Sequence, residues 1–144
     1  LALAALARRS LVGSPLLQGK PVTWIDRGRH VAALCCYLVM AVLSSVPGEL
    51  RPHVPGFSDK LEHFAAFLVL GAVTVLSSSQ AFSGRRLFAI VVAYAAVLEV
   101  GQYFIPGRVA SLLDLAASSA GALVGVTLGL SVRRSPAMSP ALRR

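Results

Sequence analysis

The sequence predicts an all-α protein, a polytopic transmembrane bundle of four helices. Of its 144 residues, 56% are hydrophobic and only 14% are charged, and the mean hydropathy is +0.71. A soluble domain would carry about 25% charged residues. Four apolar stretches are separated by short segments rich in proline, glycine or arginine, which favour chain breaks between helices.

These breaks divide the chain into three parts. Residues 1–30 are predicted to be a basic cytoplasmic tail, residues 31–132 a four-helix transmembrane domain, and residues 133–144 a second basic cytoplasmic tail. The first helix is predicted over residues 31–46, because Pro47-Gly48 ends it.

The second and third helices are predicted from their end signals. Asp59 is expected to be the N-cap of a helix that runs to about Leu76, with Glu62 as its capping-box partner. Residues 83–86, Ser-Gly-Arg-Arg, are expected to form a turn. The third helix is predicted over residues 87–105, where Pro106-Gly107 closes it.

The fourth helix is predicted over residues 109–132 and carries a glycine at every fourth position. Gly121, Gly125 and Gly129 therefore share one helical face. Small residues at this spacing let another helix approach closely in a membrane. We expect these glycines to be helix-packing positions.

The distribution of basic residues predicts the orientation. Eleven of the fourteen Lys and Arg residues fall in the two tails and the second loop, and three fall near the first and third loops. Because positive charge accumulates on the cytoplasmic side, both termini are predicted to be cytoplasmic. The net charge of +8 is explained by contact with anionic lipid headgroups, so membrane lipid and not nucleic acid is the expected partner.

In this orientation the start of the second helix, the end of the third and the start of the fourth lie at the outer face. Ionisable groups within lipid are costly and by default mark a functional site. The residues that form this polar cluster are Asp59, Lys60, His63, Glu99, Gln102, Arg108, Ser111, Asp114 and Ser118.

Three motifs in this region occur in a familiar order. They are DKLEHFAAF at residues 59–67, E-x-x-Q at Glu99 and Gln102, and PGR-x-x-S-x-x-D ending at Asp114, with Gly121 seven residues later. Together they resemble the VanZ-like family of bacterial membrane proteins over residues 44–125. One position departs from that family, which usually has Asn four residues after the Asp; Ser118 keeps a hydroxyl there but lacks the amide.

The resemblance implies a place in the cell and a pathway, but no reaction. It implies a multi-pass protein of the bacterial inner membrane with a role in the cell envelope. The family takes its name from an accessory gene of antibiotic resistance that is linked to tolerance of the glycopeptide teicoplanin.

The polar cluster supports three hypotheses. It can be an internal ion-pair network in a scaffold protein. It can bind a polar or anionic group, such as the headgroup of a lipid or of a lipid-linked cell-wall precursor, through Arg108 and Lys60. It can also belong to a membrane enzyme that uses His63 with Glu99 or Asp114 for acid-base chemistry. A single histidine without thiolates is a weak zinc set, so no metal and no cofactor is predicted.

Overall fold

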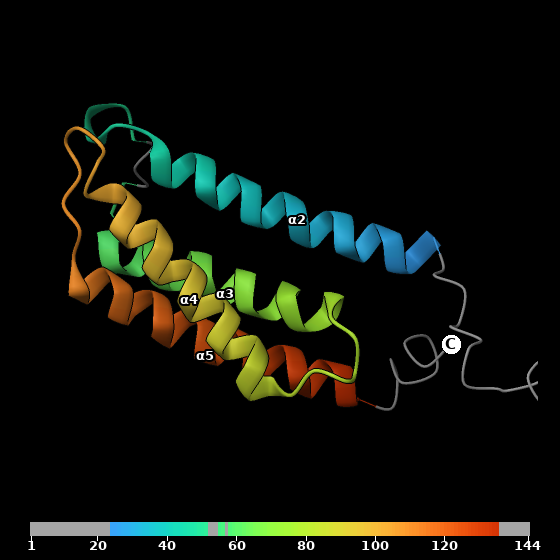
Figure 1. Cartoon of the computed structure of the whole chain (residues 1–144). Helices are drawn as coiled ribbons and strands as arrows, with labels where there is room; N and C mark the ends of the chain where they lie inside the picture. The colour runs from blue at the N-terminus through green and yellow to red at the C-terminus, as the bar shows by residue number, and fades with distance from the viewer. Residues whose placement is uncertain (1–23, 52–54, 57, 136–144) are drawn as a thin grey trace, which may run out of the picture.

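The computed structural model describes residues 24–51, 55–56 and 58–135, and over these residues the protein is all-helical, with no strand (Figure 1). The predicted all-α class is therefore confirmed. Residues 1–23 and 136–144, most of the two predicted tails, lie outside the described residues. The elements in chain order are α2 (Trp24–Ser45), the short 3-10 helix η2 (Gly48–Leu50), α3 (Asp59–Ser77), α4 (Gly84–Gln102) and α5 (Leu112–Arg134).

Among the described residues, three of the four long helices are long and apolar enough to cross a membrane. These stretches are Arg27–Ser45 within α2, the whole of α3 and the whole of α5. The helix α4 has 19 residues, like α3, but it includes Arg85, Arg86 and Glu99. Because these charges lie near both ends of α4, every 18-residue stretch of the helix contains all three, so a fourth span stays a prediction.

The first described helix begins earlier than its apolar run. We expected it to start at Val31, but α2 begins at Trp24, inside the segment predicted to be the N-terminal tail. The prediction was wrong because hydropathy marks where a helix becomes apolar, whereas intrahelical backbone hydrogen bonds continue through polar residues. The early turns of α2 contact α3, since Ser77 Oγ donates to the Arg29 carbonyl over 3.0 Å.

The N-cap of α3 is Ser58 and not Asp59. The Ser58 hydroxyl accepts a hydrogen bond from the Leu61 amide at 3.3 Å, and Asp59 is the first helical residue. Serine and aspartate are comparable N-caps, so local preference does not separate them. The Asp59 carboxylate forms an ion pair with Arg51 instead.

Serine N-caps also place the starts of α4 and α5 differently from the prediction. Ser83 caps α4, and the residues that follow it form the first helical turn where a non-helical turn was expected. The helix α4 ends at Gln102, before the expected Ile105. Ser111 caps α5, which therefore starts three residues later than Val109. In both helices the serine hydroxyl accepts from the amide three residues on, which satisfies an unpaired N–H group.

The closest contact in the bundle joins α3 and α5. A Cβ atom built on Gly121 would overlap the Phe64 carbonyl oxygen, and one built on Gly125 would overlap the Leu68 carbonyl oxygen. At Gly129 it would lie 2.9 Å from a side-chain carbon of α3. All three glycines thus face α3, and only the missing side chains let the two backbones approach this closely.

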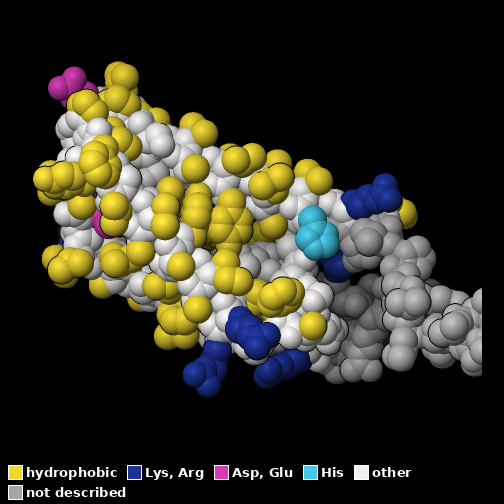
Figure 2. All heavy atoms as spheres, in the orientation of Figure 1, with side chains coloured by type: hydrophobic (Ala, Val, Ile, Leu, Met, Phe, Trp, Pro, Cys, Tyr) yellow, Lys and Arg dark blue, Asp and Glu magenta, His cyan; other side chains and the backbone are white. Residues whose placement is uncertain are grey.

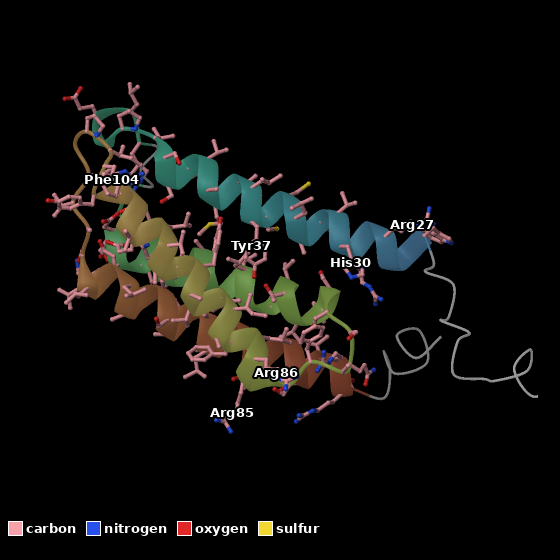
Figure 3. The ribbon with its side chains drawn as sticks, viewed as in Figure 1. Arg27, His30, Tyr37, Arg85, Arg86 and Phe104 are labelled. Atoms are coloured by element: carbon pink, nitrogen blue, oxygen red, sulfur yellow. The ribbon has the colours of Figure 1, made fainter. Side chains whose placement is uncertain are left out.

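In contrast, side chains hold α2 against the bundle. Tyr37 is the main anchor and points from α2 toward the other helices (Figure 3). Its hydroxyl lies 2.9 Å from Thr74 Oγ1 of α3, and its backbone carbonyl accepts from the Tyr94 hydroxyl of α4 at 2.5 Å. The rings of Tyr37 and Tyr94 meet edge to face with centroids 4.8 Å apart.

The two ends of the bundle differ in charge. Figure 3 places Arg27, Arg85 and Arg86 toward one end and Phe104 at the other. Hydrophobic side chains cover much of the face between the two ends, as expected for a surface in contact with lipid (Figure 2). We call these the basic end, where α4 begins, and the polar end, where α2 and α4 stop and α3 and α5 start.

We expect Gly125→Ala to destabilise the protein, because its Cβ would meet a backbone carbonyl that cannot rotate away. Forced overpacking of this kind costs about 1–3 kcal/mol. Thermal unfolding of the detergent-solubilised protein measures the effect. The matched control is Gly101→Ala on α4, where a Cβ would meet nothing within 4 Å. Equal melting temperatures for the two variants would contradict the close contact between α3 and α5.

Candidate functional site

A cavity of about 500 Å³ opens at the polar end, between α2, α3 and α4. Its volume falls within the range of small-molecule sites, about 300–1,000 Å³. The polar residues that line it are Ser44, Arg51, Glu62, His63, Glu99, Gln102, Arg108 and Ser118. The apolar residues that line it are Met40, Leu43, Ala65, Ala66, Phe67, Ala95 and Leu98. The cavity is thus amphipathic, with charged groups and a hydrocarbon surface in one enclosure.

Arg51 organises the charges at the start of α3. One of its terminal nitrogens forms an ion pair with Asp59, and the other forms one with Glu62 at 2.8 Å. A planar guanidinium is suited to hold two carboxylates at once. Because Arg51 comes from the segment after η2, these ion pairs connect the loop that follows α2 to the first turn of α3.

Lys60 and Asp114 link α3 to α5. Their charged atoms lie 3.6 Å apart, which is an ion pair but too long for a direct hydrogen bond. Asp114 is only 6% exposed, and its Oδ1 has no hydrogen-bond partner among the described residues. The ammonium group of Lys60 is therefore the main compensation for a buried negative charge.

The Glu99 carboxylate accepts a hydrogen bond from a helix start and forms no ion pair among the described residues. Glu99 is 7% exposed, and its Oε1 accepts a hydrogen bond from the backbone N–H of Ser111, the N-cap of α5. The unpaired N–H groups at a helix N-terminus and the helix dipole both favour a negative charge there. The end of α4 is thus joined to the start of α5.

His63 and Ser118 meet across the same interface of α3 and α5. His63 Nδ1 lies 3.3 Å from Ser118 Oγ, and the tautomer of the ring decides which atom donates. Possible metal-ligating atoms of Asp59, His63 and Asp114 also lie within 4.8 Å of one another. One nitrogen and two carboxylate oxygens can hold a divalent cation. Here, however, Arg51 and Lys60 already balance the two carboxylates.

Arg108 differs from the other cations of the site because its partners are carbonyl groups. Nε donates to the Val46 carbonyl at 3.0 Å, and Nη2 donates to the Leu43 carbonyl at 2.9 Å. None of the ion pairs between described residues includes Arg108. Burial lowers the pKa of Arg108 and the charge of Arg51 lowers it further, whereas Asp59 and Glu99 act in the opposite direction. The guanidinium stays protonated at neutral pH.

Two further contacts join chain segments around the cavity. The Gln102 side-chain amide donates to Ser44 Oγ over 3.0 Å, which joins α4 to α2. The Gly48 amide donates to the Pro106 carbonyl at 3.2 Å. Gly107 has a φ of +73°, a conformation that suits glycine, and it lies directly against Gly48. The loop before α5 is thereby held against η2.

All nine residues of the polar cluster lie at the polar end, but only some line the cavity. His63, Glu99, Gln102, Arg108 and Ser118 line it. The other four are Asp59, Lys60, Ser111 and Asp114, which contact one another or residues of the cavity wall.

Sequence reasoning missed three polar lining residues, Ser44, Arg51 and Glu62. A usable signal existed for Arg51, a lone cation in the outer loop before two acidic residues at a helix start. Glu62 was assigned to helix capping, a role that the Ser58 cap excludes.

A comparison with protein-family models supports the resemblance seen in the motifs. The model of the VanZ/LLP1 family matches residues 22–133. This range is wider than the expected residues 44–125 and includes all of the helices α2, α3 and α4 and all but the last residue of α5. Searches of curated proteins and of solved structures found no match.

We expect Lys60 and Asp114 to be energetically coupled. Lys60→Ala leaves the buried carboxylate without its counter-charge and should lower stability, whereas in Lys60→Ala/Asp114→Asn that charge is absent. The coupling energy of contacting charges is about 0.5–3 kcal/mol. A double-mutant cycle on thermal or denaturant unfolding measures it.

Arg86→Gln, at the basic end, is the control partner for this cycle. Its effect should add to that of Lys60→Ala, because the two residues lie at opposite ends of the bundle. A coupling energy of zero for Lys60 and Asp114 would show that their ion pair does not stabilise the fold.

Proposed function

The chain belongs to the VanZ/LLP1 family, and we propose that it is a bacterial cell-envelope membrane protein that binds a polar or anionic group at the outer membrane face. The bound group is the headgroup of a lipid or of a lipid-linked cell-wall precursor. The proposal extends to the family's link with glycopeptide tolerance, in which such a precursor would be the molecule affected.

The observation that carries this proposal is Arg108 in the wall of the cavity. Two of its N–H groups donate to the carbonyl oxygens of Leu43 in α2 and of Val46 just after it, and within the described part of the chain no carboxylate forms an ion pair with its remaining donors. Such a guanidinium in a partly desolvated site is well suited to a phosphate or carboxylate. Lys60, which we expected to share this role, forms an ion pair with Asp114 and does not line the cavity.

The polar residues therefore divide into two groups with different roles. Arg51 with its two carboxylates, and Lys60 with Asp114, connect elements of the fold. Arg108, His63 and Gln102 present polar groups to the cavity. In this proposal the ion pairs build the site and the second group contacts the ligand.

The paired charges also favour a second candidate function, a scaffold protein in which the cluster only stabilises helix packing. Each of the three ion pairs between described residues joins two segments of the chain, and breaking the pair of Lys60 and Asp114 would leave a buried carboxylate without its counter-charge. An enzymatic role would need His63 as acid or base; in the structure its neighbours are Asp59, Asp114 and Ser118. Turnover of a bound ligand would distinguish that role from binding alone.

We further propose four spans with both ends of the chain in the cytoplasm of the bacterial inner membrane. The basic end carries Arg85 and Arg86 at the start of α4 and Arg133 and Arg134 at the end of α5, in agreement with the rule that positive charge stays inside. In this orientation the cavity faces the outer leaflet.

Arg108→Gln should release a phosphate-containing lipid that copurifies with the wild-type protein. A hydrogen bond to a charged group contributes about 1.5–3 kcal/mol, which corresponds to roughly tenfold or more in affinity. Mass spectrometry of lipids extracted from the purified protein measures the loss and identifies the lipid class. Arg85→Gln, at the basic end, is the control and should retain the lipid.

The same variants are then tested in a deletion strain for susceptibility to teicoplanin, with membrane abundance checked by immunoblot. We expect Arg108→Gln to be abundant but inactive, and Arg85→Gln to behave as wild type. If Arg108→Gln loses function only because it disappears from the membrane, the scaffold function replaces the binding function.

The orientation predicts the accessibility of single cysteines in a variant with Cys35 and Cys36 replaced by Ala. A cysteine at the exposed position Glu49, in η2, should react with a membrane-impermeant maleimide on intact cells. A cysteine at the exposed position Gln80, between α3 and α4, should react only after permeabilisation. The reverse pattern would place the cavity at the cytoplasmic face.

A further inference from the structure

We propose that the cavity binds an amphiphile whose phosphate lies at Arg108 and whose hydrocarbon chain occupies the apolar part of the same enclosure. This inference rests on the proposed function and specifies its ligand as a phosphate joined to a chain. A site for a headgroup alone would need only the polar wall. Here about half of the lining residues are apolar, and they come from α2, α3 and α4.

The apolar lining is continuous with the polar lining along individual helices. On α3, Ala66 and Phe67 follow His63, so they lie about one turn deeper from the polar end. On α4, Ala95 precedes Glu99 by one turn and Met40 of α2 precedes Ser44 by one turn, again toward the middle of the bundle. A ligand with its charge at the polar end thus meets hydrocarbon below it.

Small side chains make room for this chain. Ala66 and Ala95 are among the lining residues of α3 and α4, where larger residues would fill the space between helices. Met40 has a flexible, unbranched side chain that adapts to irregular apolar ligands. A chain in this part of the cavity would bury apolar surface that otherwise stays open.

The cavity also reaches the apolar surface of the bundle. Leu43 of α2 and Ala65 of α3 line it and are both exposed. These two residues place an opening between α2 and α3, on a surface that faces lipid in the proposed orientation. A volume of about 500 Å³ is too small for a whole two-chain phospholipid, so part of the ligand would extend through this opening into the bilayer.

The test uses the purified protein in detergent and native mass spectrometry. Lysophosphatidic acid supplies a phosphate and an acyl chain, and farnesyl phosphate supplies a phosphate and an isoprenoid chain. Monoacylglycerol has the chain without the phosphate, and glycerol phosphate has the phosphate without the chain. We expect the two chain phosphates to bind best, and the tighter of them identifies a glycerophospholipid or a polyprenyl-linked precursor as the source.

Ala66→Leu fills the apolar part and should weaken binding of both chain phosphates about tenfold, the affinity of about two buried methylene groups. Ala66→Ser adds a polar hydroxyl with little added volume and should also weaken the binding of both chain phosphates. The matched control is Ala93→Leu, because Ala93 is exposed on α4 and does not line the cavity. Thermal unfolding confirms that each variant is folded.

The outcomes separate this inference from the proposed function. If both Ala66 variants bind the chain phosphates as wild type does, the chain does not enter the cavity and the inference is overturned. The headgroup site would then still be tested by the binding of glycerol phosphate and by the effect of Arg108→Gln on phosphate binding. If Arg108→Gln binds lysophosphatidic acid no more weakly than wild type does, the proposed phosphate site fails, whatever the Ala66 variants show.

Discussion

The close contact of α3 with α5 is the constraint on which the rest of the structure depends. Gly121 and Gly125 bring the two backbones together below the polar end, and this spacing determines what can meet above them. His63 reaches Ser118, and Lys60 reaches Asp114, only because the two helices are this close. Packing in the apolar half therefore sets the geometry of the polar half.

Four carboxylates, two of them buried, gather at one end of so small a protein because each has a compensating partner. Asp59 and Glu62 share a guanidinium, Asp114 faces an ammonium group, and Glu99 accepts from the N-terminus of α5. These partners come from different elements, so every compensated charge also joins two parts of the chain. The free energy that would be lost on separating them acts against separation of the elements.

The sequence was sufficient for the helical class, the gathering of the polar residues at one end of the bundle and the pattern of glycines, because these follow from composition, helix order and helical period. It was not sufficient for helix starts, since several serines and Asp59 are equivalent caps until tertiary contacts choose among them. It also did not indicate that Arg51 would form the ion pairs with the carboxylates, whereas Arg108 would donate to backbone carbonyl groups. Both arginines lie in loops, where helical periodicity carries no information about partners.

Two walls of the cavity, α3 packed against α5 on one side and α2 on the other, differ in how they can respond to a ligand. Moving α3 relative to α5 would break backbone packing at several glycines at once, so this wall is rigid. The helix α2 is held by the side-chain contacts of Tyr37, by Ser44 and by the carbonyls that bind Arg108. These contacts can be exchanged one at a time, and one of them involves the residue that would bind the phosphate. A ligand whose phosphate binds Arg108 would therefore act directly on α2, which is the wall that can move.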